Sequence, residues 1–106
     1  MTEKYEVIRW SLFEAPDPQQ LRRILTREGY GVFQWSDEPG ATYESHRHST
    51  HQSHWIISGV LELIVDGIGV VTLNPGDRDL MPANTTHSAR VIGDDPVVYL
   101  IGEKSS

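Results

Sequence analysis

The chain of 106 residues has a formal net charge of -6, 38% hydrophobic residues, 23% charged residues and no cysteine. A chain of this length has room for one domain with a single core. Its negative charge argues against a general affinity for nucleic acid or anionic membranes, because both depend on clustered Lys and Arg. Without cysteine, disulfides, iron–sulfur clusters and thiolate zinc sites are excluded, so any metal must be held by nitrogen and oxygen.

The N-terminus, MTEKYEVIRW, has no apolar core followed by a small-residue cleavage site. No apolar run in the chain approaches the roughly 20 residues of a membrane span. We therefore expect a cytoplasmic protein with neither a membrane nor a nucleic acid as partner.

Residues 5–13, YEVIRWSLF, are apolar enough to form an N-terminal strand. Such a strand would be either an ordinary edge strand or an extension of the sheet of a second copy in a homodimer. Both interpretations remain open at the level of sequence.

A short helix is predicted over residues 17–29, with Asp17 as N-cap, Pro18 at the first helical position and Gly29 closing it. Gln20 would complete a capping box. The apolar residues fall at helical spacing, so one stripe should pack inward while the arginines face outward. The stripe comprises Leu21, Ile24 and Leu25, and the outward residues are Arg22, Arg23 and Arg27.

After the helix come short runs rich in Val, Ile, Tyr and Trp, divided by Gly, Pro, Asn and Asp, a pattern typical of β-strands. Turn sequences at 66–69 (DGIG, a hairpin), 74–77 (NPGD) and 93–96 (GDDP) have a spacing typical of an antiparallel sandwich or barrel. The expected strands are 31–36, 42–48, 52–58, 60–65, 69–73, 79–82, 86–92 and 96–102.

Four of the five histidines lie within GATYESHRHSTHQSH, residues 40–54. His46 and His48 are two apart, so on a strand both rings point to the same face and can bind one metal ion. A turn at 49–51 would return the chain as a neighbouring strand, on which Gln52 faces the same interior. His87 could reach this cluster from a later strand, although alone it fits a half-exposed loop histidine equally well.

Together these residues resemble the two motifs of the cupin superfamily. Gly40, five residues, His46-Arg47-His48, three residues, Gln52, six residues and Gly59 resemble G-x5-H-x-H-x3,4-E-x6-G. Gly76, five residues, Pro82-Ala83-Asn84, two residues and His87 resemble G-x5-P-x-G-x2-H-x3-N.

The resemblance covers about residues 38–102 and implies an all-β fold, a cupin-type antiparallel, jelly-roll-like β-barrel, here with one short N-terminal helix. The expected organisation is a single domain: an N-terminal strand and helix over 1–37, the barrel over 38–102 and a frayed tail over 103–106. The resemblance also implies one divalent transition metal (Fe, Mn, Ni, Cu or Zn) near one mouth of the barrel. Its ligands, carried over position by position, are His46, His48, Gln52 and His87.

Three positions depart from the motifs: Gln52 replaces Glu, Asn84 replaces Gly and Val91 replaces Asn. Asn84 is a mild change because Asn accepts positive φ better than most residues. A glutamine ligand brings no negative charge, so metal affinity should fall while the ion becomes a stronger Lewis acid. Alternatively, Gln52 stays outside the coordination sphere and three histidines hold the ion.

Other residues near the motifs have weaker assignments. His51 has the opposite parity to Gln52 and fits a surface turn, whereas His54 shares the parity of Gln52. His54 is therefore a candidate catalytic acid or base, or a partner of a metal ligand, with a satisfied core histidine as the alternative. Expected liners of the cavity are Trp35, Tyr43, Trp55 and Met81. Either Arg78 or Asp79 could face a ligand, but a solvated pair is the preferred interpretation.

Because cupin barrels serve unrelated functions, three classes of function remain open for this chain. The preferred one is a metal-dependent enzyme of dioxygenase, isomerase, lyase or cyclase type, acting on a small carbonyl, enol or carboxylate compound. A non-catalytic barrel that binds or senses a sugar or small acid is the alternative. A relic that binds no metal in use is less favoured, since all the histidines are retained. Small cupins often form homodimers, which we also expect here.

Overall fold

The computed structural model describes residues 4–106, which form two antiparallel sheets and one helix. The five-stranded sheet has the order β1 (Glu6–Ile8), β7 (Arg78–Leu80), β4 (His51–Ser58), β9 (Val97–Lys104) and β2 (Gly31–Asp37). The four-stranded sheet has the order β3 (Thr42–His46), β8 (His87–Ile92), β5 (Val60–Val65) and β6 (Gly69–Leu73).

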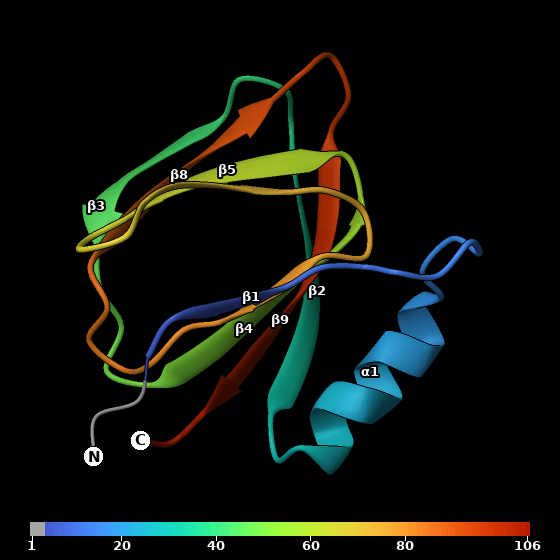
Figure 1. Cartoon of the computed structure of the whole chain (residues 1–106), viewed down its shortest axis with the longest axis horizontal. Coiled ribbons are helices and arrows are strands. Elements are labelled where there is room, and N and C mark those ends of the chain that lie inside the picture. Colours follow the sequence, from blue (N-terminus) through green and yellow to red (C-terminus); the bar gives the residue numbers. More distant parts are fainter. Residues whose placement is uncertain (1–3) are drawn as a thin grey trace.

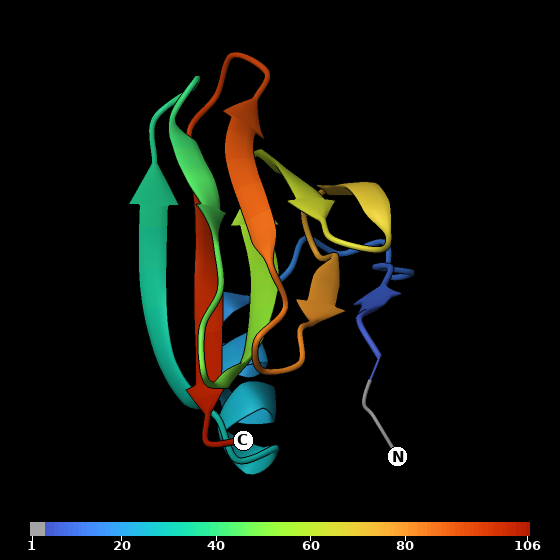
Figure 2. The ribbon, with the colours of Figure 1, turned by 90° about the vertical axis from the view of Figure 1, so that its left-hand side faces the viewer.

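The two sheets are layered as in a jelly roll, as Figures 1 and 2 show. In Figure 2, β3 and β8 pass in front of β4 and β9. Side chains of both sheets meet between the layers in one core that includes Ile56 of β4, Leu61 and Leu63 of β5 and Tyr99 of β9. The predicted all-β, cupin-type barrel with a short N-terminal helix is confirmed.

Helix α1 (Pro18–Arg27) begins as predicted, with the Asp17 carboxylate accepting a hydrogen bond from the backbone N–H of Gln19 at 3.1 Å. The buried Leu21 and Leu25 pack with Trp55 and other residues of a second core cluster. This cluster joins the helix to the outer face of the five-stranded sheet (Figure 1). The helix therefore covers the face of the sheet that is turned away from the barrel interior.

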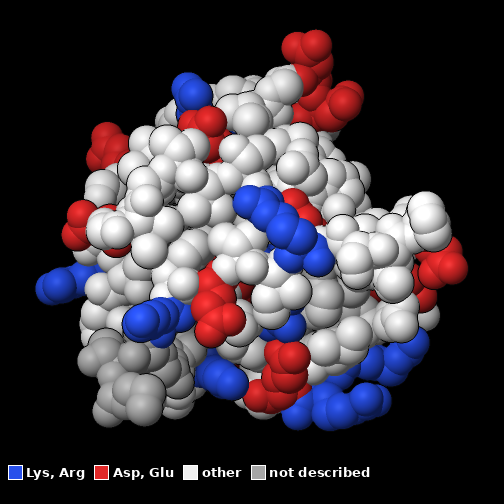
Figure 3. Space-filling view, viewed as in Figure 1, with Lys and Arg blue, Asp and Glu red and all other residues white. Residues whose placement is uncertain are grey.

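The three helix arginines at 22, 23 and 27 are exposed, as expected. In the space-filling view, basic side chains gather over α1, whereas acidic ones are scattered over the same face (Figure 3). No helix within residues 4–106 is long and apolar enough to cross a membrane.

Of the two roles expected for residues 5–13, the structure shows an edge strand within the chain's own sheet. Only Glu6–Ile8 forms this strand, β1, which pairs antiparallel with β7. The following residues are fastened by Asp77, whose carboxylate accepts hydrogen bonds from the Arg9 side chain and the Trp10 backbone, both at 2.9 Å. A homodimer stays a prediction.

Two strand ends differ from the sequence expectation in ways that affect the site. β3 ends at His46, so His48 lies beyond the strand and not on it. β9 continues to Lys104, because Glu103 pairs with both Gly31 of β2 and Gln52 of β4. The expectation of a frayed tail from residue 103 was therefore wrong for its first two residues.

Candidate metal centre

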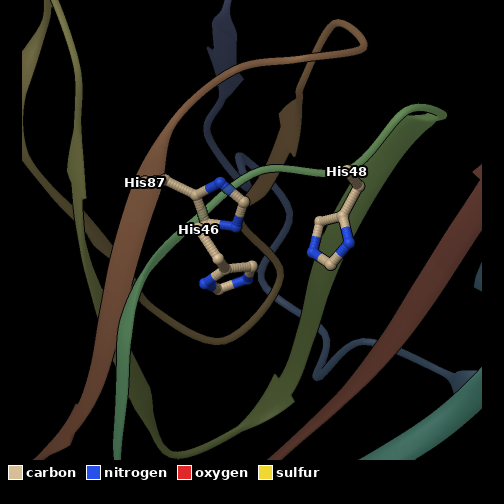
Figure 4. Close-up of side chains that lie close together, drawn as sticks. All are labelled: His46, His48 and His87. Atoms are coloured by element: carbon tan, nitrogen blue, oxygen red, sulfur yellow. The ribbon is translucent and has the colours of Figure 1, made fainter.

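Three histidines from two parts of the chain converge at one end of the barrel (Figure 4). His46 at the end of β3 is paired across the sheet with His87 at the start of β8, and their ring centroids are 4.4 Å apart. His48 faces them at 4.8 Å from His46 and 5.6 Å from His87. One ring nitrogen of each lies within 4.8 Å of the others. The structure thus brings together three of the four predicted ligands.

Backbone carbonyls hold two of these rings in one orientation. Nδ1 of His46 lies 2.6 Å from the Glu44 carbonyl oxygen, and Nδ1 of His87 lies 2.9 Å from that of Thr85. Because a carbonyl only accepts, Nδ1 of each ring carries the proton and Nε2 of the neutral ring has a free lone pair. Metal-binding histidines are commonly oriented in this way.

The electrostatics of the cluster favour neutral imidazoles. Burial lowers the pKa of His48, and the neighbouring His46 and His54 lower it further, while Glu103 acts in the opposite direction. Burial also lowers the pKa of His87, with the other histidines contributing, although its hydrogen bond to a backbone carbonyl opposes the shift. A metal ligand must be neutral imidazole, so these shifts suit coordination.

Gln52 lines the same cavity from β4, and it is only 4% exposed. Its Nε2 donates a hydrogen bond of 3.2 Å to Oε2 of Glu103, its partner on β9. Glu103 also lines the cavity and was missed at the level of sequence, where it was assigned to the tail. Alternation along β9 could have identified it, since Tyr99, Ile101 and Glu103 share one parity and all line the cavity.

His54 is buried beside Asp79. Its Nδ1 lies 3.0 and 3.2 Å from the two carboxylate oxygens, and its backbone N–H donates to Oδ1 at 2.8 Å. The Tyr5 hydroxyl donates to Oδ2 at 2.9 Å. Burial works to lower the pKa of His54, but the charge of Asp79 and its hydrogen bond outweigh that effect, so the pKa is raised. His54 lines the cavity, with its ring 6.2 Å from that of His87.

The expectation that Arg78 and Asp79 form a solvated pair was wrong. Arg78 is 5% exposed and Asp79 is fully buried. The guanidinium of Arg78 lies 4.4 Å from the Trp55 ring centroid and binds Glu28 at 2.9 Å, while Asp79 binds His54. Single-sequence patterns favour exposure for charged residues, but Glu28 and the buried Ser53 satisfy Arg78, and the buried His54 satisfies Asp79.

The three converging histidines, Gln52, His54 and Glu103 lie in the wall of a cavity of about 320 Å³. Of the four expected liners, Trp35 and Tyr43 contribute to its wall, whereas Trp55 and Met81 do not. Because side chains alternate along β4, placing Gln52 and His54 inside puts Trp55 on the opposite face, against α1. Met81 belongs to the apolar core between the sheets.

Among the histidines of residues 4–106, His51 is the one that does not line the cavity, in agreement with its parity. It does not occupy a surface turn, however, but is the first residue of β4 and is half-buried. Its Nδ1 accepts a hydrogen bond of 3.0 Å from the backbone N–H of Ala83.

The structure is a small β-barrel whose histidine cluster could hold a metal ion. The comparison with protein families identifies its class. The family model described as Cupin domain matches residues 33–102, so the chain belongs to the cupin family. No curated protein sequence matches the chain.

Solved structures with the same fold include a cupin 2 domain-containing protein from Halorhodospira halophila, at 19% identity and a TM-score of 0.75, covering 99% of this chain and 80% of that one. DMSP lyase DddQ from Ruegeria pomeroyi DSS-3 is 23% identical with a TM-score of 0.66 over 73% of this chain. A deletion mutant of oxalate decarboxylase OxdC from Bacillus subtilis is 30% identical with a TM-score of 0.63 over 70% of this chain. Another structure of that decarboxylase concerns its Mn(II) centres. The chain spans 39% of the DddQ chain and 21% of the OxdC chain.

Proposed function

We propose that this cupin is a metal-dependent enzyme acting on a small carbonyl, enol or carboxylate compound. The observation that carries the proposal is the convergence of His46, His48 and His87, with ring nitrogens within 4.8 Å of one another. The carbonyls behind two of the rings fix them in the tautomer that binds a metal. The donor set therefore fits a divalent transition ion, with nitrogen ligands suitable for Fe, Mn, Ni, Cu or Zn.

Gln52 is the proposed fourth metal ligand. If it does not coordinate, it is a polar neighbour of the coordination position that the three histidines leave free. Its Nε2 is engaged by Glu103, so its Oε1 is the atom available to an ion or a ligand. The carboxylate of Glu103 supplies the negative charge that glutamine lacks at the motif position. The likeness to oxalate decarboxylase, a protein with Mn(II) centres, makes Mn(II) a natural first ion to test.

When bound, the ion would polarise a ligand oxygen as a Lewis acid. His54 is the proposed acid or base, because Asp79 holds a proton at its Nδ1 and leaves Nε2 to exchange a proton with a ligand in the cavity. Tyr5 donates to Asp79 and keeps that carboxylate in place. An isomerase, lyase, cyclase or dioxygenase can use such a pair of metal and imidazole.

The alternative is a non-catalytic barrel that binds or senses a sugar or small acid. The cavity is compatible with this alternative. Its volume of about 320 Å³ suits a small ligand whether or not a reaction follows. A sugar fits less well than an acid, because the wall away from the histidines is mainly apolar. Tight ligand binding without turnover on any tested compound would favour this alternative.

Metal analysis of untagged protein tests the proposed site. Wild-type protein should hold one divalent ion, and His48→Ala and His87→Ala should each lose it. His51→Gln is the matched control, because His51 lies on β4 outside the converging group. Equal metal content in all four proteins would reject histidine ligation. The homodimer and the cytoplasmic location stay predictions beside this proposal.

A further inference from the structure

The cavity has two chemically different ends. The polar end carries the imidazoles of four histidines together with Gln52 and Glu103. The other end is apolar and combines the two sheets: Phe33, Trp35, Tyr43, Leu61, Leu63, Ala89, Tyr99 and Ile101. Leu61 and Leu63 are almost completely buried, whereas Phe33, Trp35 and Tyr43 are between 37% and 48% exposed.

The polar atoms of the aromatic residues at the apolar end are already satisfied. The hydroxyls of Tyr43 and Tyr99 donate to the Asp37 carboxylate at 2.6 and 3.0 Å. The indole N–H of Trp35 donates to the same carboxylate at 3.1 Å. These rings therefore present carbon surfaces to a ligand, with no donor left over for a second polar group.

Lysine and arginine side chains are absent from the cavity wall within residues 4–106. Arg78 of β7 and Arg90 of β8 have other partners: Arg78 pairs with Glu28, and Arg90 pairs with Glu62 of β5 at 2.7 Å. The acidic Glu103 lies in the wall, and a proton on His54 is balanced by the carboxylate of Asp79. A carboxylate held against Leu61 and Leu63 would therefore be buried without a counter-charge, which is strongly unfavourable.

We infer that the ligand of this cavity is a singly charged or enolisable oxygen compound with an aromatic, ring-sized apolar body, and not a small dianion. The oxygen atoms of the ligand lie at the histidine end, and this part of the inference rests on the proposed function. The apolar part of the ligand lies among Leu61, Tyr99 and Ile101, and this part depends only on the composition of the cavity wall.

Charge balance at the polar end leads to the same class of ligand. The histidines are neutral ligands and Gln52 is uncharged, so Glu103 alone offsets a divalent ion. One negative charge on the ligand completes the balance, whereas a second one brings an excess of negative charge into a partly buried site. A monoanionic head is therefore the best match.

Three 2-oxo acids test the inference because they share one head and differ only in the body. Pyruvate carries a methyl group, phenylpyruvate an aromatic ring and 2-oxoglutarate a second carboxylate. Calorimetry on the Mn(II)-treated protein and on the metal-free protein should give phenylpyruvate an affinity at least about 10-fold higher than either of the others. Equal or tighter binding of pyruvate or 2-oxoglutarate would overturn the inference.

The metal-free arm separates this inference from the proposed function. If the protein binds no metal but still prefers phenylpyruvate, the proposed metal site fails and the assignment of the apolar end stands. If metal binds at the histidines but phenylpyruvate is not preferred, the proposed metal site stands and the assignment of the apolar end fails.

Two matched variants test whether the cavity wall is responsible for the ligand preference. Ile101→Lys places a cation in the wall and should shift the preference toward 2-oxoglutarate by about 10-fold or more. Ile64→Lys makes the same change at a position that is 53% exposed and outside the wall, so it should keep the wild-type order. Identical ligand orders in the two variants would place the ligand elsewhere and overturn the inference.

Discussion

The side-chain amide of Gln52 donates to the carboxylate of Glu103 across the β4 and β9 pair, at 3.2 Å. The motif position that usually carries an acid is thus neutral here, and an acid occupies the neighbouring strand. The two residues together offer the oxygen and the negative charge that one glutamate would provide.

The first prediction concerns this pair. Glu103→Gln should weaken Mn(II) binding about 10- to 100-fold, because the charge and the orientation of the Gln52 amide are both lost. The double variant Gln52→Glu with Glu103→Gln returns one carboxylate to the site and should recover most of the affinity. Competition with a chelator measures the Mn(II) affinity of the single and the double variant.

Glu38→Gln is the control for the loss of one acidic group, since Glu38 is exposed in the loop after β2. If the Mn(II) affinities of Glu103→Gln and Glu38→Gln agreed within twofold, the proposed contribution of Glu103 to metal binding would be contradicted.

Metal occupancy should depend on pH through the histidines. The pKa values of His48 and His87 are lowered, so both rings stay neutral down to a pH below the unperturbed value of about 6.5. Occupancy at fixed total metal should therefore hold at pH 7 and decline as the pH falls below that value, when protons displace the ion. A flat binding curve down to pH about 4 would count against histidine ligation.

The buried His54 and Asp79 pair should stabilise the fold in its ionised form. Because the pKa of His54 is raised in the folded state, its contribution is complete below the unfolded value of about 6.5 and is lost as the pH rises through the folded pKa. Urea unfolding between pH 6 and 9 should show this decline. Asp79→Asn should lower the pKa of His54 and flatten the decline, and NMR titration of the ring can verify the shift.

Asp77 should contribute to acid unfolding. Burial works against its charged form, but hydrogen bonds from the Trp10 and Asn74 backbone and from Arg9 outweigh it and lower its pKa. Its contribution is therefore present above the unfolded value of about 3.9 and is lost as the pH falls through the folded pKa.

Asp77→Asn should cost about 1.5–3 kcal/mol at pH 7 and lessen the pH dependence below 4. Arg9→Ala should cost less, because the Arg9 side chain is 57% exposed. Denaturant titration of the two variants compares them, and equal losses would argue against Asp77 as the centre of this contact.

Helix attachment should affect stability without affecting the metal centre. Leu25 is fully buried between α1 and the five-stranded sheet, so Leu25→Ala should cost about 2–5 kcal/mol. Ile64→Ala, at an exposed position, should change stability by less than about 0.5 kcal/mol. Metal affinity of both folded proteins should equal that of the wild type. A loss of affinity in Leu25→Ala would indicate that the helix supports the site.

Much of the fold was predictable because its signals are local. The turn residues divide the chain into strands of nearly the observed length, and the capping residues mark the start of α1. The motif glycines are also explained by local geometry: Gly59 and Gly76 have φ values of 78° and 89°. At each, a Cβ atom would collide, with Pro96 or with the Trp10 ring.

The candidate site was predictable in part. The spacing of His46, His48 and His87 indicated convergence, because a family motif encodes contacts between distant positions. Glu103 and Asp79 were missed or misassigned, since their partners lie on strands remote in sequence and charged residues are usually exposed. Trp55 was misassigned for a simpler reason: its parity on β4 is opposite to that of His54.

Asp37 accepts hydrogen bonds from Trp35 on its own strand, from Tyr99 on the neighbouring strand and from Tyr43 on the opposite sheet. One carboxylate thus links the two layers beside the aromatic residues that line the cavity. The 2.6 Å bond from Tyr43 joins the layers at this point, and a charged acceptor strengthens such a bond. If the proposed aromatic ligand binds here, we expect Asp37 to act as a spacer that sets the width open to its ring, so that thickness as well as charge would decide which compounds enter.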